Sequence, residues 1–336
     1  MRSDRRSYKV AGIRGEARGR IIDQAEALDA PLTAVEIEAA RRRIAGRTLC
    51  IPLVAALEKG PWLKLECLQP TGSYKIRGAT NALMARSESG VALRTIVSAS
   101  AGNFGQAIVA AAHSLGAKAI VHVPDNAARV KIDNLERHGA LVRQHSFADW
   151  WRIMESRETG DDGAFFHPVC EREVIAGAAT IGEEVLEDLP EVDAVLVPVG
   201  GGGLISGIAQ AIKAKRPRCR ILAVETEAAL PLHAALQAGA PVTVERRPSF
   251  IDGMGSTRVL DAMWPLLRRL VDDVLIVTVA EVEAAIRRLV ADHHVIAEGA
   301  GAAALAASSQ IASERAVAIV SGGNLDGAEL RRILAP

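Results

Sequence analysis

The chain has few cysteines and no pair of them at metal-binding spacing. Its four cysteines are scattered over 336 residues without a C-x-x-C pair: Cys50, Cys67, Cys170 and Cys219. This pattern is typical of reduced thiols in an intracellular protein and argues against a zinc site. No apolar run has the length of a membrane-spanning helix, and the first residues lack the apolar core of a signal peptide. We therefore expect a cytoplasmic protein that binds no membrane.

The chain also lacks net charge. Lys and Arg total 40, Asp and Glu also total 40, and the formal charge at pH 7 is +0. Nothing therefore attracts the protein to nucleic acid or to an anionic surface. Arginines gather near the N-terminus among acidic residues, and residues 1–30 are interpreted as an N-terminal extension. A length of 336 residues with 49% hydrophobic residues predicts a globular protein of two lobes or domains.

Strand-like and helix-like segments alternate along the chain. Short apolar runs predict strands at 95–98, 118–123, 194–199, 221–224, 274–277 and 316–320. Helices are predicted at 79–85, 105–115, 129–138, 204–214 and 281–292. Continuous apolar strands separated by helices predict parallel sheets covered on both faces, so the fold class is α/β. Ligands of such folds bind beyond the C-terminal ends of the strands.

The strongest local signal is a run of glycines between a predicted strand and a predicted helix: Gly200, Gly201, Gly202 and Gly203. Such a loop can turn several N–H groups onto one anion, and the following helix adds its positive end. A flexible turn is the alternative. The loop also partly fits a dinucleotide-binding fingerprint, with Glu225 ending the next strand, but Ser206 replaces its third glycine. A phosphate-binding loop is therefore favoured over an NAD site.

Lys75 lies in the run Thr71-Gly72-Ser73-Tyr74-Lys75-Ile76-Arg77-Gly78-Ala79, just before a predicted helix. Partial desolvation and a helix N-terminus both disfavour the ammonium form of a lysine. A neutral amine is what Schiff-base chemistry requires. From this run alone, a surface lysine beside a turn is the simpler interpretation, and the other motifs decide between the two.

Three further motifs contain residues that could bind a ligand. Small residues in Ser98-Ala99-Ser100-Ala101-Gly102-Asn103 expose N–H groups for a substrate carboxylate, although a capping turn is equally compatible. Ser321, in Ser321-Gly322-Gly323-Asn324, places a hydroxyl where a ring nitrogen could meet it, or caps a helix. Glu298, in Glu298-Gly299-Ala300-Gly301-Ala302, either faces the cleft or caps a helix.

Taken in chain order, these motifs resemble the fold type II pyridoxal-phosphate enzymes, in particular the serine/threonine dehydratase and serine racemase family. The resemblance covers the chain from about residue 33 onward. It implies two lobes, each a mainly parallel sheet flanked by helices, as in the β subunit of tryptophan synthase. It also implies a large cofactor-binding domain of residues 31–90 and 172–336, a small mobile domain of residues 91–171, and a homodimer.

The resemblance implies pyridoxal 5′-phosphate as cofactor and a role for each motif. Lys75 would bind the cofactor covalently and later move the Cα proton of an amino-acid substrate. Asn103 would meet the ring oxygen and Ser321 the ring nitrogen. The phosphate would be held by the backbone of Gly200, Gly201, Gly202, Gly203 and Leu204. The substrate carboxylate would be held by Ser100, Ala101 and Asn103. The cofactor supplies the electron sink, while the protein sets geometry and charge.

The implied reaction is β-elimination from a 3-hydroxy amino acid, such as L-threonine or L-serine, to a 2-oxo acid and ammonia. Ala101 stands where racemases of the family carry a second serine, which favours a lyase. Glu225 matches one ligand of the family's cation site, but Pro231 replaces the aspartate, so no metal is expected. Phe104 and Tyr74 replace a histidine and a phenylalanine, which leaves open other substrates, including the hydroxylated diaminobutyrate of hydroxyectoine breakdown. An NAD-binding oxidoreductase and a non-catalytic cofactor carrier are the remaining alternatives.

Overall fold

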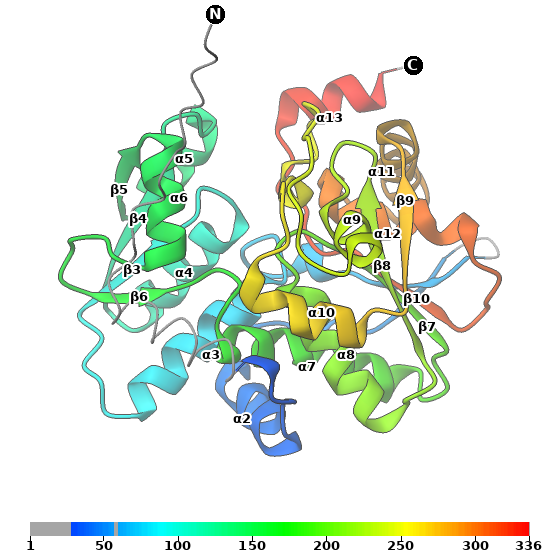
Figure 1. Cartoon of the computed structure of the whole chain (residues 1–336), viewed down its shortest axis with the longest axis horizontal. Coiled ribbons are helices and arrows are strands. Elements are labelled where there is room, and N and C mark those ends of the chain that lie inside the picture. The colour runs from blue at the N-terminus through cyan, green and yellow to red at the C-terminus, as the bar shows by residue number, and fades with distance from the viewer. Residues whose placement is uncertain (1–27, 57–59, 336) are drawn as a thin grey trace, which may run out of the picture.

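The computed structural model describes residues 28–56 and 60–335, whose strands form two sheets (Figure 1). The larger sheet has six strands in the order β1-β2-β10-β7-β8-β9, and the smaller has four in the order β5-β4-β3-β6. Every pairing is parallel except that of β1 with β2. The predicted α/β fold of two mainly parallel sheets is confirmed. Most of the predicted N-terminal extension, up to residue 27, lies outside the described residues.

The larger sheet contains β1 (Val54–Ala55), β2 (Trp62–Lys64), β7 (Ala194–Pro198), β8 (Arg220–Thr226), β9 (Asp273–Val277) and β10 (Ala316–Ile319). The smaller contains β3 (Thr95–Ala99), β4 (Lys118–Pro124), β5 (Ala140–His145) and β6 (Ala164–Phe166). The α-helices are α2 (Ala34–Ile44), α3 (Lys75–Glu88), α4 (Asn103–Ser114), α5 (Arg129–Arg137), α6 (Phe147–Ser156), α7 (Arg172–Asp188), α8 (Gly203–Lys215), α9 (Pro231–Ala238), α10 (Trp264–Leu270), α11 (Val279–His293), α12 (Gly299–Ala306) and α13 (Gly327–Leu334). Short 3-10 helices are η1 (Glu66–Leu68), η2 (Asp252–Met254), η3 (Asp261–Met263) and η4 (Ala307–Gln310). The predicted strands are confirmed to within two residues, whereas α3 is longer at both ends than the predicted 79–85.

Helices cover both faces of the larger sheet, because its strands are apolar on both sides. Val195 and Val197 of β7 belong to the core cluster that contains α7, α8 and α10. Leu196, between them, belongs to the cluster on the other face, with α11 and α12. Successive side chains of a strand point to opposite faces, so one buried strand contributes to two cores. This burial fixes the sheet, and with it the loops at the C-terminal ends of its strands.

α3 connects the two lobes. Its apolar residues Ile76, Ala79 and Leu83 belong to the core cluster of the smaller sheet. Its backbone also touches α7, because a Cβ atom on Gly177 would lie 2.6 Å from the Cα atom of Gly78. Figure 1 shows α3 and α7 between the smaller sheet, with α4 to α6, and the larger sheet. The domain division at residues 31–90, 91–171 and 172–336 stays a prediction. Within the described residues, no helix has the length and apolar content needed to cross a bilayer.

Candidate active site

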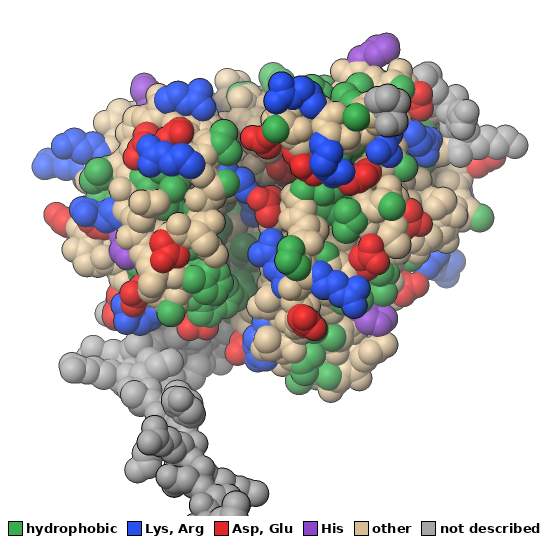
Figure 2. All heavy atoms as spheres, turned by 90° about the horizontal axis from the view of Figure 1, so that it is seen from above, with side chains coloured by type: hydrophobic (Ala, Val, Ile, Leu, Met, Phe, Trp, Pro, Cys, Tyr) green, Lys and Arg blue, Asp and Glu red, His purple; other side chains and the backbone are tan. Residues whose placement is uncertain are grey.

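The candidate site lies where loops from both sheets face each other. Seen from above, the surface is hollowed between the two lobes (Figure 2). The loops after β3, β7 and β10 all carry predicted site residues: Ser100, the glycines from Gly200, and Ser321. Because β7 and β10 are parallel neighbours in the larger sheet, the loops after them lie at one edge of it. The hydrogen bond from Asn324 to Asn103 brings the segment after β3 against the loop after β10. The sequence predicted that these motifs follow the C-terminal ends of strands, and in the structure they do.

Lys75 is the first residue of α3 and is partly buried. Its Nζ atom donates a hydrogen bond to the carbonyl oxygen of Pro168 at 3.2 Å. The same atom lies 5.1 Å from the ring centre of Tyr74 and 5.8 Å from that of Phe104. Aromatic rings at such distances hold a lysine head group in place. The head group of Lys75 is therefore enclosed by specific contacts, and Lys75 is not a solvated surface lysine.

The loop before Lys75 is fastened to the loop that contains Ser321. The backbone N–H of Tyr74 donates to the carbonyl of Ser321 at 3.0 Å, and that of Gly323 to the carbonyl of Gly72 at 2.8 Å. Gly72 has a φ of +71°, and a Cβ atom there would lie 2.3 Å from Oδ1 of Asn324. Only glycine fits this contact without movement. Ser321, with 5% of its surface exposed, is thereby held next to the lysine loop.

Asn103 joins the smaller lobe to the larger one. It is the first residue of α4, and its Nδ2 atom donates to Oε1 of Glu298 at 2.6 Å. Its Oδ1 atom accepts a hydrogen bond from Nδ2 of Asn324 at 2.8 Å. Asn324 also donates to the carbonyl of Thr71 at 2.9 Å. Sequence reasoning gave Asn324 no role of its own, although an amide directly after the glycine pair was a signal for one.

Glu298 faces the cleft. It is the N-cap residue of α12 but makes no side-chain capping bond, so the capping interpretation is wrong. Burial raises the pKa of Glu298 to about 7, against the hydrogen bond from Asn103, which favours the ionised form. The negative charge of Asp252 adds to the increase, and Lys131 and Lys75 oppose it. The cleft thus contains a carboxyl group that changes charge near neutral pH.

The glycine loop has the geometry of an anion cradle. Gly202 has a φ of +90°, and a Cβ atom on Gly201 would lie 2.6 Å from Cγ2 of Val169. The N–H groups of Gly200, Gly201 and Gly202 donate no hydrogen bond to any described residue. Directly after them α8 begins at Gly203, where the first-turn N–H groups have no partner within a helix. These donors together fit a phosphate group.

Three further polar groups, two in the lysine loop and one in the loop after β3, bear on this fit. The hydroxyl oxygens of Thr71 and Ser73 are buried without a hydrogen-bond partner among the described residues. Sequence reasoning did not single out these two hydroxyls. Ser100, in the loop after β3, accepts a hydrogen bond from the N–H of Gly102 at 3.3 Å. Ala101 beside it is partly buried and brings only a methyl group to the loop. Polar groups from both lobes thus suit a polar cofactor and a small zwitterionic substrate.

Glu225 does not belong to this site. Its two carboxylate oxygens accept hydrogen bonds from the N–H groups of Leu232 at 2.8 Å and His233 at 2.9 Å, in the first turn of α9. Burial raises the pKa of Glu225 to about 7, although these two hydrogen bonds favour the charged form. Pro231 is the first residue of α9. The carboxylate therefore caps a helix, which removes the acid that a dinucleotide site would use for ribose.

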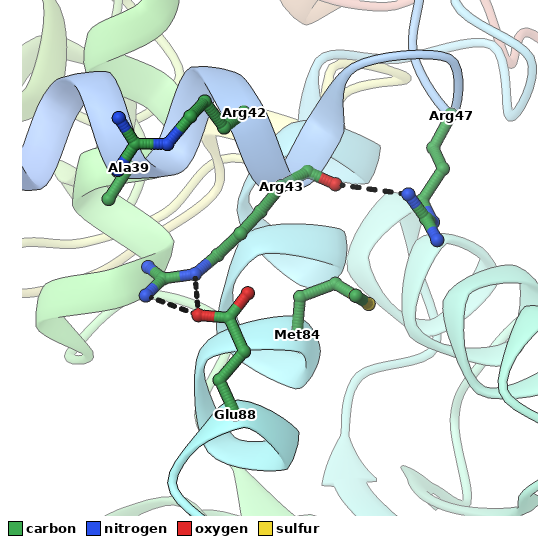
Figure 3. A pocket seen from close by; sticks show the side chains of 6 residues that line it. All are labelled: Ala39, Arg42, Arg43, Arg47, Met84 and Glu88. Carbon is green, nitrogen blue, oxygen red and sulfur yellow. Dashed lines mark hydrogen bonds and ion pairs between the residues drawn. The ribbon is translucent and has the colours of Figure 1, made fainter.

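A second hollow, on the surface between α2 and α3, lies away from the candidate site. It has a volume of about 180 Å³ and is lined by Ala39, Arg42, Arg43, Arg47, Met84 and Glu88 (Figure 3). Arg43 Nε donates to Glu88 at 2.8 Å, and Arg47 donates to the carbonyl of Arg43 at 3.5 Å. No predicted site residue lines this hollow between α2 and α3, and its one carboxylate is already paired with Arg43. It therefore offers no chemistry comparable to that around Lys75.

The fold is that of an α/β enzyme with two mainly parallel sheets. The cleft between them contains a glycine loop that suits an anionic cofactor and a partly buried lysine. The chain belongs to the pyridoxal-phosphate-dependent enzymes: the family described as "Pyridoxal-phosphate dependent enzyme" matches residues 43–322. The predicted family and the predicted cofactor are thereby confirmed.

Similar proteins cover most of the chain. An L-threonine ammonia-lyase of Thermotoga maritima is 37% identical over 81% of this chain and 69% of its own. The structure of maize serine racemase aligns with a TM-score of 0.81 and 31% identity, covering 90% of this chain and 97% of that one. The structure of a threonine deaminase from T.th. aligns with a TM-score of 0.78 and 33% identity, covering 88% and 99%. The chain is thus similar to both lyases and racemases of this family.

Proposed function

We propose that the protein is an ammonia-lyase that eliminates water from a 3-hydroxy amino acid, with L-threonine and L-serine as the first candidates. Similarity to the Thermotoga maritima L-threonine ammonia-lyase supports this reaction. The observation that carries it is the position of Lys75, whose Nζ atom lies among the rings of Tyr74 and Phe104 and the carbonyl of Pro168. One amine in a partly enclosed setting suits removal of a single Cα proton.

Each residue group has a defined task in this proposal, and Asn103 has two. The N–H groups of the glycine loop, Gly200 to Gly203 with Leu204, bind the phosphate, and Ser321 contacts the ring nitrogen as a neutral hydroxyl. Asn103 contacts the ring oxygen, and it holds the substrate carboxylate together with Ser100 and the backbone at Ala101. The bound cofactor supplies an electron sink for the electrons of the broken Cα–H bond.

The atoms and protons balance over the whole reaction. Lys75 takes the Cα proton, an equal proton is returned to the β-hydroxyl, which leaves as water, and one water molecule is consumed later in hydrolysis. The released enamine becomes an imine, which water hydrolyses to a 2-oxo acid and ammonia. The neutral hydroxyl of Ser321 would not hold a ring nitrogen protonated as a carboxylate does, which would favour prompt loss of the β-hydroxyl.

A racemase is the second candidate, because the maize serine racemase has the same fold at 31% identity. Racemisation needs a second acid/base group on the opposite face of the substrate. Ala101 offers none, and the only side-chain hydroxyl in the triplet Ser100-Ala101-Gly102 is that of Ser100, which already accepts a hydrogen bond. Formation of D-serine from L-serine without pyruvate would favour this candidate over the lyase.

A hydroxylated diaminobutyrate is a further substrate candidate for the same elimination. Glu298 lies in the cleft, and the charge of Asp252 helps to raise its pKa. A distal ammonium group on the substrate would favour the ionised form of this carboxyl group. A cytoplasmic homodimer with a mobile small domain of residues 91–171 completes the proposal, and sedimentation of the purified protein checks the dimer.

Replacing the lysine tests the proposal. Lys75→Ala should remove the yellow absorbance of the bound cofactor and lower kcat by about 1000-fold or more, because both the covalent link and the base are lost. Reduction of the wild-type protein with borohydride, followed by peptide mapping, should place the pyridoxyl group on Lys75. Ammonia release from L-threonine, L-serine and a hydroxylated diaminobutyrate then ranks the substrates. A Lys75→Ala protein that keeps the absorbance and turnover would contradict the proposal.

A further inference from the structure

His167 is a buried histidine in the connection from the smaller lobe back to the larger one. It lies between β6 and α7, with 4% of its surface exposed. Its Nδ1 atom accepts two backbone hydrogen bonds, from the N–H of Val169 at 3.0 Å and from that of Cys170 at 2.8 Å. This is the pattern of an Asx turn, in which a side-chain acceptor at one residue binds the N–H groups two and three residues later.

The turn is fixed from its other side as well. The N–H of His167 donates to Oε1 of Glu171 at 2.8 Å, and Arg157 donates to the same oxygen at 3.2 Å. Pro168 has no N–H and holds the residue before it in an extended conformation. Burial lowers the pKa of His167 to about 3, with the charges of Arg157 and Lys75 acting in the same direction. The ring therefore stays neutral, as an Nδ1 acceptor must.

The turn contacts both halves of the cofactor site. The carbonyl of Pro168 accepts the hydrogen bond from Nζ of Lys75. The side chain of Val169 lies directly under the glycine loop, where a Cβ atom on Gly201 would come within 2.6 Å of it. One acceptor atom thus sets the direction of the carbonyl that holds the lysine and the position of the side chain that supports the phosphate cradle.

We propose that His167 is a positioning residue for Lys75 and for the glycine loop, acting through the backbone turn that its Nδ1 atom organises. The inference rests on the proposed role of Lys75. Whenever the lysine nitrogen is not bound to the cofactor, the carbonyl of Pro168 holds it through one N–H. The rings of Tyr74 and Phe104 confine it, and the nitrogen remains directed to the cleft for covalent attachment and for proton transfer.

Two substitutions separate the effect of the Nδ1 hydrogen-bond acceptor from the effect of the size of the ring. His167→Phe keeps the bulk and removes the acceptor, whereas His167→Asn keeps an acceptor in Asx-turn position and removes most of the ring. The rate of covalent attachment is followed as the yellow absorbance that appears when pyridoxal phosphate is added to the full-length protein freed of cofactor. We expect His167→Phe to slow attachment by about 10- to 100-fold, because small displacements of a reacting group have effects of this size. His167→Asn should stay within about threefold of wild type, a small part of that range.

His122 provides the matched control. It is also a fully buried histidine, but it lies in the smaller sheet beside His145 and Asp161. His122→Phe should lower the melting temperature and leave the attachment rate unchanged. Borohydride mapping of Lys75 in the wild type, done first, tests the proposed function separately from His167. Attachment and kcat at wild-type values in His167→Phe would overturn the inference, as would a folded His167→Asn slowed by about tenfold or more. If His167→Phe does not fold, His167→Asn alone decides.

Discussion

The carboxyl group of Glu298 lies in the cleft with an amide, that of Asn103, as its hydrogen-bond partner. Its pKa rises from 4.5 to about 7 in the folded protein, chiefly through burial. The folded state therefore keeps a proton that the unfolded chain releases between these two values. Its contribution to the free energy of unfolding is complete below pH 4.5 and is lost as the pH rises towards about 7. Burial raises the pKa of Glu171 and Glu225 to about 7 too, so all three groups act in the same direction.

Glu298→Gln should make stability less dependent on pH. The amide oxygen can still accept the hydrogen bond from Asn103, but it does not ionise. At pH 7 the cofactor-free variant should exceed the wild type in free energy of unfolding by about 1 kcal/mol, after allowance for partial solvent screening. Near pH 4, below the pKa of 4.5 of the unfolded chain, the two proteins should be equal. Urea unfolding at several pH values measures this, with Glu245→Gln, at an exposed position, as the control for loss of one acidic side chain. An unchanged slope in Glu298→Gln would contradict the pKa assignment.

At the scale of elements, α3 is held by a buried group of charges around Arg77, two residues after Lys75. Arg77 donates to Glu66 through Nε and Nη2, both at 2.8 Å, and to Glu184 at 2.6 and 2.8 Å. Lys64 of β2 donates to the same Glu184 at 2.5 Å. The side chains of Arg77 and Lys64 are fully buried. This group joins α3 to β2 and α7, and so fixes the end of the helix that carries the lysine.

Arg77→Met should destabilise the protein strongly. Glu184 would keep Lys64 as a cationic partner, whereas Glu66 would lose the cationic partner that it has in Arg77. Breaking a buried ion pair costs about 3–5 kcal/mol. Arg43→Met is the matched control, because Arg43 pairs at 2.8 Å with Glu88, whose side chain is 52% exposed. A pair of this kind contributes about 0–1 kcal/mol. Denaturant unfolding compares the two variants, and equal losses would show that the buried group does not hold α3.

The sequence predicted those parts of the site that are local. The ends of the six predicted strands, the glycine loop and the run around Lys75 are patterns within a few neighbouring residues, and the structure contains them. The sequence did not predict β1, β2, β5 and β6. Local patterns could not predict the long-range side-chain contacts. Asn103 and Glu298 are 195 positions apart in the sequence, and Arg77 and Glu184 are 107 apart. His167 gave no signal either, because a histidine in the role of an Asx-turn acceptor breaks the residue pattern by which such turns are recognised.

At the scale of the whole molecule, two groups of side-chain contacts between described residues cross the cleft between the lobes. Asn103 donates a hydrogen bond to Glu298 and accepts one from Asn324. Lys131 of α5 forms an ion pair with Asp252 of η2, on the opposite side. The side chains of this pair are 31% and 51% exposed, so salt in the solvent screens it. If the small lobe closes over the substrate, as the proposed mobile domain implies, this pair stabilises the closed state.

Lys131→Met should weaken substrate binding and remove its dependence on salt. In the wild type, raising the salt concentration from about 0.05 to about 0.5 M should increase KM by about two- to fivefold, because an exposed ion pair contributes up to about 1 kcal/mol. The variant should show the higher KM at both concentrations, with kcat changed less than KM. Lys213→Met is the control, since Lys213 pairs with Asp272 at 2.8 Å within the larger lobe. Steady-state kinetics at the two salt concentrations measures the effect, and a Lys131→Met protein with the KM of the wild type at both would show that the pair does not stabilise closure.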